Sequence, residues 1–304
     1  MNLRLQPCRV SIASLVVCVS IQAAAQTVAF LSDTQAPMWV EKLVLKSNNN
    51  VAATGLVFRD ILDQRPASLF ILGDVVKAGY KTKTWQNIDR YLDSCRKAGI
   101  KVSALLGNHD VMTRQRKGEA QFQRRFPDHN RTGFYVVVDS VAVLFLNSNF
   151  SKMSSGDIQA QQSWYIKTLK AMESDNGVLA TIVSCHHAPY TNSKIVGSSK
   201  NVQKYFVPGY LASLKARLFI TGHSHNFEWF KKDGKDFLVI GGGGGLRQPL
   251  TTKEDRLEDA AAEYKPQFHY VRMQRFPDQL RFTSRYLKPD FSGFADGVSF
   301  TVAY

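Results

Sequence analysis

Short apolar runs alternate along the chain with longer stretches in which apolar residues recur every three or four positions. The short runs are rich in Val, Ile, Leu and Phe and predict strands. In the first two thirds of the chain, strands are expected at residues 28–31, 69–72, 102–105, 178–184 and 218–220. The helical spacing predicts helices at residues 51–62, 85–97, 159–172 and 202–214. This alternation is typical of a layered α/β domain.

Antiparallel pairing is also indicated. Residues 134–139 and 141–146 predict two strands that turn at Ser140. Further strands are expected in the last third, at residues 228–232, 237–240, 268–275 and 280–286. A charged loop from Gly241 to Pro266 interrupts them. Because no repeat, low-complexity linker or composition break divides the chain, we expect one domain over residues 26–304.

Residues 1–25 have a different pattern from the rest of the chain. Arg4 and Arg9 precede an apolar run over residues 12–21, and three alanines follow at residues 23–25. This order is typical of a secretory signal peptide cleaved before Gln26, which predicts a secreted or periplasmic protein. A retained anchor is the alternative, although the run is shorter than the roughly 20 apolar residues that a membrane-spanning helix needs. No later segment is apolar enough to span.

Composition and charge narrow the class of partner. The chain has 304 residues, of which 44% are hydrophobic and 21% charged, so it can bury a substantial core and is not a disordered chain. The formal net charge is +14, or +12 without Arg4 and Arg9. This excess favours anionic partners such as phosphate esters or acidic surfaces, with a solvated basic surface as the alternative.

Polar residues that can bind metal follow five of the predicted strands. The first place holds Asp33 and Gln35, whose side chains share a face of an extended segment. The second is Gly73-Asp74, where the glycine lets the backbone turn and exposes the carboxylate. Taken alone, each of these two places is more often a turn or a helix cap than a site.

The three later places carry more information. They are Gly107-Asn108-His109-Asp110, His186-His187 and Gly222-His223-Ser224-His225, and they hold five of the seven histidines of the chain. Open α/β sheets bind ligands at the carboxyl ends of their strands. Carboxylates, imidazoles and amide oxygens hold divalent cations, and two such ions close together assist the hydrolysis of phosphate esters. The sequence therefore predicts a binuclear metal site.

This ordered series of motifs resembles the calcineurin-like metallophosphoesterase superfamily, purple acid phosphatases included. The resemblance runs from Asp33 to His225, about two thirds of the chain. It implies an α/β fold of two mixed sheets flanked by helices, in four layers ordered α/β/β/α. It also implies a hydrolase of phosphorylated small molecules that uses two divalent metal ions, Mn, Fe or Zn. We expect no specific nucleic-acid partner.

The resemblance also implies a role for each site residue. Asp33, Gln35 and His225 would hold the first metal, Asp74 would bridge, and Asn108, His186 and His223 would hold the second. A hydroxide that bridges the two metals would attack phosphorus. His109 would face the substrate as an acid or charge stabiliser, and Asp110 would orient it.

The chain departs from the family pattern at two positions. Gln35 stands where most of the superfamily carries histidine, and Lys77 stands where purple acid phosphatases carry a metal-binding tyrosine. The iron(III) subtype is therefore not expected. Glutamine at this position resembles the manganese-dependent ADP-ribose and CDP-alcohol diphosphatase branch, and we expect the first site to bind its metal more weakly.

Four questions remain open from the sequence. Strand register favours His186 as the ligand, whereas counting back from Pro189 favours His187. Gln35 favours a diester or diphosphate substrate, whereas export favours a monoester. The basic residues that follow the third motif, Arg114, Arg116 and Lys117, either steer phosphate or form a solvated loop. A catalytically silent protein that binds metal or polyanions is the alternative to an enzyme.

The run of five glycines at residues 241–245 resembles a phosphate-binding loop only in part. Neither a Lys-Ser/Thr pair nor a helix start follows it, so it is not a P-loop. Glycine permits close approach of the backbone to a neighbour. We therefore expect a tight passage of the chain beside the metal site.

Overall fold

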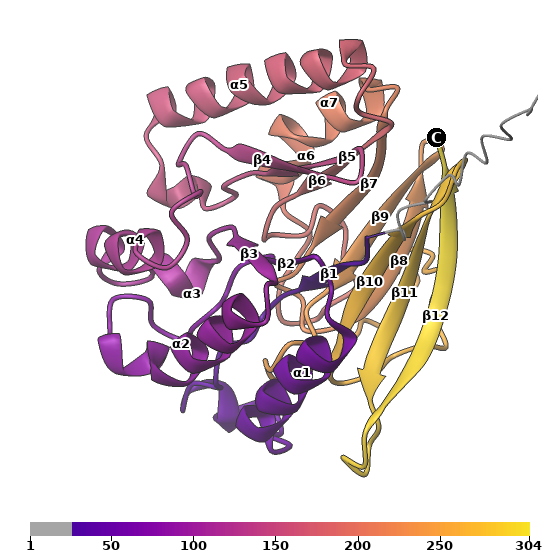
Figure 1. The fold of residues 1–304 in the computed structure, drawn as a ribbon. Helices are drawn as coiled ribbons and strands as arrows, with labels where there is room; N and C mark the ends of the chain where they lie inside the picture. Colours follow the sequence, from indigo (N-terminus) through magenta and orange to yellow (C-terminus); the bar gives the residue numbers. More distant parts are fainter. Residues whose placement is uncertain (1–25) are drawn as a thin grey trace, which may run out of the picture.

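The computed structural model describes residues 26–304 as two six-stranded sheets between layers of helices (Figure 1). The expected fold class, two mixed sheets flanked by helices, is confirmed. The signal-peptide prediction lies outside the described residues. Within residues 26–304, no helix has the length and apolar character needed to cross a membrane.

The first sheet has the order β12-β11-β10-β1-β2-β3. Its parallel strands are β1 (Val28–Leu31), β2 (Ser68–Ile71) and β3 (Lys101–Ala104). Its antiparallel strands are β10 (His269–Arg275), β11 (Gln279–Leu287) and β12 (Phe294–Ala303). Helices α1 (Asn50–Gln64) and α2 (Thr82–Lys97) cover the outer face, where their buried apolar residues form one cluster with those of β1 to β3.

The second sheet has the order β4-β5-β6-β7-β9-β8. Its parallel strands are β5 (Val141–Phe145), β6 (Ala180–Ser184), β7 (Ala216–Thr221) and β9 (Lys235–Ile240). Antiparallel pairs are completed by β4 (Phe134–Val138) and β8 (Phe227–Lys232). Helices α5 (Ser155–Ser174), α6 (Lys200–Tyr205) and α7 (Val207–Ala212) lie on its outer face.

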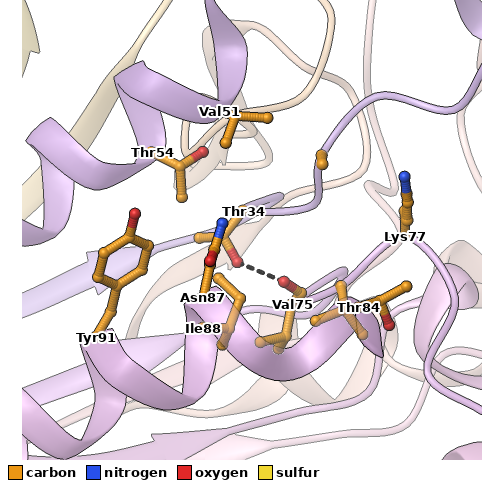
Figure 2. Close-up of a pocket in the computed structure, with 11 residues that line it drawn as sticks. Thr34, Val51, Thr54, Val75, Lys77, Thr84, Asn87, Ile88 and Tyr91 are labelled. Carbon is orange, nitrogen blue, oxygen red and sulfur yellow. Dashed lines mark hydrogen bonds between the residues drawn. The ribbon is translucent and has the colours of Figure 1, made fainter. Parts of the chain in front are cut away.

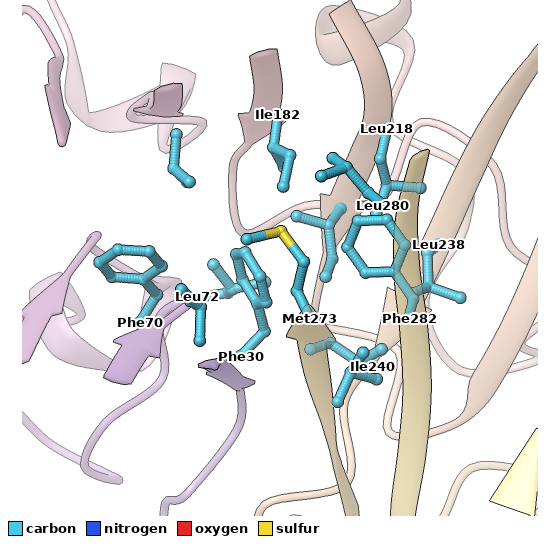
Figure 3. Close-up of a cluster of buried hydrophobic side chains, with 14 of the residues drawn as sticks. Phe30, Phe70, Leu72, Ile182, Leu218, Leu238, Ile240, Met273, Leu280 and Phe282 are labelled. Atoms are coloured by element: carbon cyan, nitrogen blue, oxygen red, sulfur yellow. The ribbon is translucent and has the colours of Figure 1, made fainter. Parts of the chain in front are cut away.

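Period-two alternation along the strands produces these layers. In β1, Val28 and Phe30 belong to the core between the sheets, whereas Ala29 and Leu31 face the helices. Side chains from both sheets meet in that central core, and Figure 3 shows Phe30 and Ile182 among them. Strands β1 and β2 are therefore buried on both faces, which explains their mostly apolar sequences, whereas the edge strand β3 begins with the exposed Lys101.

Three elements were not predicted, and one predicted helix is divided. Helices α3 (Asn108–Val111) and α4 (Gln115–Gln123) follow β3 in a stretch where no element was predicted, and β12 was not predicted at all. The helix expected at residues 202–214 is two short helices, α6 and α7. Pro208 has no N–H to donate, so a continuous helix would lack a hydrogen bond there.

Asp60 on α1 connects the helix layer to the first sheet. Its carboxylate accepts a hydrogen bond from the Tyr270 hydroxyl at 2.7 Å and another from Nη2 of Arg285 at 2.8 Å. The Asp60 side chain is 11% exposed and that of Arg285 is 17% exposed. Removing this carboxylate would leave two nearly buried donors without their main partner.

We expect Asp60→Ala to lower the free energy of unfolding by about 2–4 kcal/mol, because breaking a buried pair leaves an uncompensated charge. Urea denaturation measures this change. Asp296→Ala is the matched control, since Asp296 also contacts Arg285, at 3.2 Å, but its side chain is 52% exposed. The control should lose less than about 1 kcal/mol. Equal losses in the two variants would contradict a special role for Asp60.

Candidate metal centre

The seven predicted ligands all lie just after strands, six of them on loops and Asn108 at the start of α3. They come from both sheets: Asp33 and Gln35 follow β1, Asp74 follows β2, Asn108 follows β3, His186 follows β6, and His223 and His225 follow β7. Because parallel strands end at the same edge of a sheet, these loops meet at one end of the central core. The side chains form two adjacent groups there.

The backbone is strained at three of these residues. Asp33, Asp74 and His223 have positive φ angles of 60°, 50° and 68°. Non-glycine residues in this left-handed region cost of order 1–3 kcal/mol each and persist only where the surroundings enforce them. Each of these turns follows a strand and aims one polar side chain at the site, so three of the ligands are held by strained backbone.

The first group contains Asp33, Gln35 and His225. Nε2 of His225 lies 3.4 Å from Oδ1 of Asp33, and Nδ1 of the same ring donates to the Leu246 carbonyl at 2.7 Å. This second bond fixes the orientation of the ring, as is usual for metal-binding histidines. Asp33 also accepts a hydrogen bond from the His223 backbone at 3.0 Å, which joins the β1 and β7 loops.

The Gln35 carboxamide has one orientation that satisfies its hydrogen bonds. In this orientation its nitrogen donates to the backbone carbonyls of Asp74 at 3.0 Å and Asp33 at 3.1 Å. The carboxamide oxygen then faces Nε2 of His225 at 3.2 Å. The oxygen, the only atom of this amide that can bind a cation, is therefore directed at the first group.

The second group contains Asp74, Asn108, His186 and His223. Nε2 of His186 lies 3.2 Å from Oδ2 of Asp74 and 3.2 Å from Oδ1 of Asn108. Nδ1 of His186 donates to the Leu72 carbonyl at 2.9 Å. Ligand atoms of Asp74, His186 and His223 all lie within 4.8 Å of one another.

This arrangement fits a cation. With Nδ1 of His186 donating to a carbonyl, a neutral ring points its Nε2 lone pair at the oxygens of Asp74 and Asn108. Such a contact between lone pairs is repulsive unless a positive charge lies between them. Either a proton or a metal ion would supply that charge, and the mixture of oxygen and nitrogen donors suits a divalent transition metal.

Electrostatics separate the histidines by role. Burial opposes ionisation of Asp74, but His186 and His109 together hold the pKa of its carboxyl far below its usual range. Burial lowers the pKa of His186, but Asp74, Asp33 and the Leu72 carbonyl together raise it, to about 9. Burial and the neighbouring His187 hold the pKa of His223 well below its usual range, so that ring is neutral and can act as a ligand.

His109 and Asp110 do not pair in the expected way. Adjacent residues of a helix do not face one another, and both residues lie in α3. Nε2 of His109 lies 3.8 Å from Oδ2 of Asp74, and its Nδ1 lies 3.4 Å from the Lys77 carbonyl. The Lys77 carbonyl, rather than the expected Asp110, is therefore the contact that orients the His109 ring.

Asp110 instead holds the loop that follows β2. Its carboxylate accepts from the backbone N–H groups of Gly107 at 2.9 Å, Val76 at 3.2 Å and Val75 at 3.4 Å. Burial and the charge of Asp74 raise the pKa of Asp110 to about 7. Asp110 thus positions the turn that carries Asp74, and it contacts the site through backbone groups.

A second contact fixes the same turn from the opposite side. The Thr34 hydroxyl donates to the Val75 carbonyl at 2.9 Å and joins the loop of Asp33 to the loop of Asp74. Figure 2 shows this bond at the wall of a small cavity of about 60 Å³. Val51 and Thr54 of α1 and Ile88 and Tyr91 of α2 also line this cavity. None of its lining residues is a predicted ligand, so we regard it as a packing void behind the site.

The glycine run passes the site closely, as predicted. A Cβ at Gly245 would lie 2.5 Å from the His225 ring, and a Cβ at Gly243 would lie 2.3 Å from the Ser32 carbonyl. The N–H groups of these glycines donate to Asp33 at 2.9 Å and to Ser32 at 2.8 Å. Only glycine permits this approach, which fixes the β1 loop against the segment that follows β9.

A cleft of about 360 Å³ opens beside the second group. Its lining includes Asn108, Ser148, Asn149, Lys152 and His187. Ser148 and Asn149 were not among the predicted site residues, although their segment directly follows the predicted strand at residues 141–146 and obeys the same strand-end rule. The cation that lines the cleft is Lys152; none of the basic residues following the third motif lines it.

Arg114, considered above as a residue that steers phosphate, contacts an aromatic ring instead. Its guanidinium lies 5.7 Å from the centroid of the Tyr80 ring, a cation–π distance. This position favours the solvated-loop interpretation of that basic segment. Tyr80 is the tyrosine nearest in sequence to Lys77, where purple acid phosphatases carry their metal-binding tyrosine, and here its ring contacts Arg114.

The two adjacent histidines have distinct environments. His186 faces Asp74 and Asn108, whereas Nδ1 of His187 pairs with the Ser148 hydroxyl at 2.8 Å. The rings of His187 and His223 are close, with 4.4 Å between their centroids. This geometry favours His186 as the ligand and leaves His187 at the wall of the cleft.

We expect His186→Ala to lose about half of the bound metal and His187→Ala to retain it, because only His186 directs a ring nitrogen at Asp74. Elemental analysis of the purified variants measures metal per chain. Removing a ligand typically weakens metal binding by at least about 10–100-fold. Loss of metal in His187→Ala alone would reverse the assignment of the two histidines.

The sequence and the fold are both similar to those of known phosphoesterases. The sequence profile of the calcineurin-like phosphoesterases matches residues 26–227. No curated protein matches the chain. Solved structures with a similar fold include purple acid phosphatase PPD1 from yellow lupin, at 17% identity and a TM-score of 0.64 over 93% of this chain. This chain spans about half of the lupin enzyme, 54% of its length.

Two further structures match along nearly their whole length. The inner-membrane-complex anchor GAP50 of Plasmodium has 13% identity and a TM-score of 0.66, covering 92% of this chain and 89% of that one. A dimetal phosphatase from Danio rerio has 12% identity and a TM-score of 0.55, covering 93% and 100%. At identities this low, the similarity shows a shared fold and nothing more specific.

Proposed function

This chain belongs to the calcineurin-like phosphoesterase family, and from that premise we propose that it is a binuclear-metal hydrolase of phosphorylated small molecules. The observation that carries the proposal is the presence of two neighbouring ligand groups, joined where the Gln35 amide donates to the Asp74 backbone carbonyl. His225 and Gln35 lie with Asp33 on one side, and His186 and His223 lie within ligand distance of Asp74 on the other. The family supports metal dependence, and the number of ions is part of the proposal.

The bound ions would supply Lewis acidity, activating water and neutralising charge on the phosphoryl oxygens. The chain itself supplies the remaining chemistry. Asp74 stays ionised at any physiological pH and offers both oxygens to the site. His109 lies above the same carboxylate, 3.8 Å from Oδ2, where it can donate a proton or charge to a leaving group.

The cleft beside the second group supports a small anionic substrate. Its volume of about 360 Å³ suits a phosphorylated small molecule, and Lys152 lies at its lining. The Ser148 hydroxyl and the Asn149 amide add neutral polar groups to this lining. Export is a further part of the proposal, supported by the signal-peptide pattern of residues 1–25.

We expect Asp74→Asn to lose bound metal and to lower turnover of aryl phosphate mono- and diesters by roughly 1000-fold or more. The change keeps the shape of the side chain and removes the charge that both ligand groups share. Assays with added Mn²⁺ measure turnover, and circular dichroism confirms folding. Near-normal turnover in this variant would refute the binuclear mechanism.

His109→Ala is the complementary variant. The backbone N–H of His109 donates to Asp74 at 2.8 Å, and this bond remains in the variant. The ring comes no closer to Asp74 than 3.8 Å, so we expect the variant to keep its metal. Turnover should fall by roughly 100-fold or more, the usual contribution of a general acid. Parallel loss of metal and turnover would instead make His109 part of the metal site.

The alternative is a catalytically silent protein on the same scaffold. The substitution of Gln35 for the usual histidine favours it, because a neutral amide binds cations less strongly than an imidazole. Metal analysis and turnover of the wild-type protein separate the two hypotheses. Fewer than one metal per chain, with no turnover in Mn²⁺, would support the silent protein.

A further inference from the structure

The segment between the Asp33 loop and α1 exposes a compact apolar cluster. Trp39 is 74% exposed, Leu43 and Val44 are each 75% exposed, and Val40 is 41% exposed. Ten large apolar residues are exposed in the described chain, and these four fall within six consecutive positions. Single exposed apolar side chains are normal, but a contiguous group indicates a contact surface.

Residues 38–46 form a small protrusion, called the knob below, which is closed by its own hydrogen bonds. The Leu45 N–H donates to the Glu41 carbonyl at 2.8 Å, and the Met38 N–H donates to the Glu41 carboxylate at 2.5 Å. The short helix η1 (Glu41–Leu43) forms its centre. In Figure 1 the indigo segment before α1 lies at the lower edge of the molecule. The apolar side chains therefore project from a defined turn of backbone.

Both ends of the knob are tied to the metal centre. On one side, the chain leads back within a few residues to Gln35. On the other side, it leads to Asn50, whose amide donates to the carbonyls of Gly244 and Gly245, each at 2.9 Å. Gly245 in turn packs against the His225 ring. The knob is therefore joined at both ends to segments that contact the first ligand group.

The charges around the knob are basic. Lys42 and Lys46 are exposed on it, whereas the carboxylate of Glu41 is engaged by the Met38 N–H. Residues 26–304 carry a formal net charge of +12, since Arg4 and Arg9 lie outside them. A tryptophan and aliphatic side chains flanked by lysines are the composition that enters the interface of an anionic lipid bilayer.

We propose that residues 38–46 dock the protein on an anionic membrane surface and hold its metal centre beside the lipid headgroups. The small area of the knob favours a membrane over a protein partner. A stable protein interface buries roughly 800 Å² on each partner, more than four side chains on one turn can offer. A lipid surface needs no shape complementarity, and a few apolar side chains combined with basic ones suffice.

Vesicle sedimentation tests this proposal. The purified protein is mixed with vesicles of phosphatidylcholine and phosphatidylglycerol, and with vesicles of phosphatidylcholine alone. We expect binding to the anionic vesicles that weakens with added salt, and at least about tenfold weaker binding for Trp39→Ser/Leu43→Ser. The same chain is used in every arm, so residues 1–25 contribute equally to each measurement.

Leu179→Ser/Leu214→Ser is the matched control, because these two leucines are 38% and 78% exposed and lie far from the knob in sequence. It should bind vesicles like the wild type. Both double variants should hydrolyse soluble aryl phosphates at the wild-type rate, so failure of the proposed catalytic function would be visible separately. Equal vesicle binding by the two variants, or no binding by the wild type, would overturn the proposal. So would self-association that only the knob variant loses.

Discussion

The carboxylate of Asp74 is the group on which the rest of the centre depends. It is 1% exposed and has histidines on two sides, His186 at 3.2 Å and His109 at 3.8 Å. A buried anion is costly unless it is paired, and a buried imidazole next to it gains by becoming positive. The charge balance of the whole site therefore requires cations around this one carboxylate, as protons or as metal ions.

Holding such a carboxylate in place requires contacts from both sheets. Asp110 and Thr34 fix its turn from the first sheet, and His186 approaches from the second. A Cβ at Gly107 would lie 2.1 Å from Asp74 itself. The packing of the two sheets on their shared core thus sets the distance between the ligand groups. A change in that core would be felt at the site without touching any ligand.

Most of this centre follows from local patterns, and the exceptions have physical causes. Apolar runs that end in polar residues identify strands and their carboxyl ends, which is why Asp33, Asp74 and His186 were found. The role of Asp110 was missed because sequence adjacency to His109 does not mean contact within a helix. The edge strand β12 was missed because it contains Asp296 and Gly297 and is half exposed. β12 pairs with β11 as an antiparallel hairpin, and the preference of a residue for a strand depends on such neighbours more than on the residue itself.

His223 and His225 illustrate the same limit. An extended segment would place both rings on one face, and both do reach the centre. The positive φ of His223 breaks the extended geometry, so the rings are divided: His225 lies with Asp33, and His223 lies with Asp74 and His186. The turn therefore gives one imidazole to each group.

Gln35 then makes the two groups chemically unequal. Its oxygen adds to those of Asp33 beside a single imidazole, whereas the second group has two imidazoles. Oxygen donors suit Mn²⁺ and imidazoles suit Zn²⁺ and Fe²⁺, so under the proposed binuclear function a harder ion would be expected in the first group than in the second.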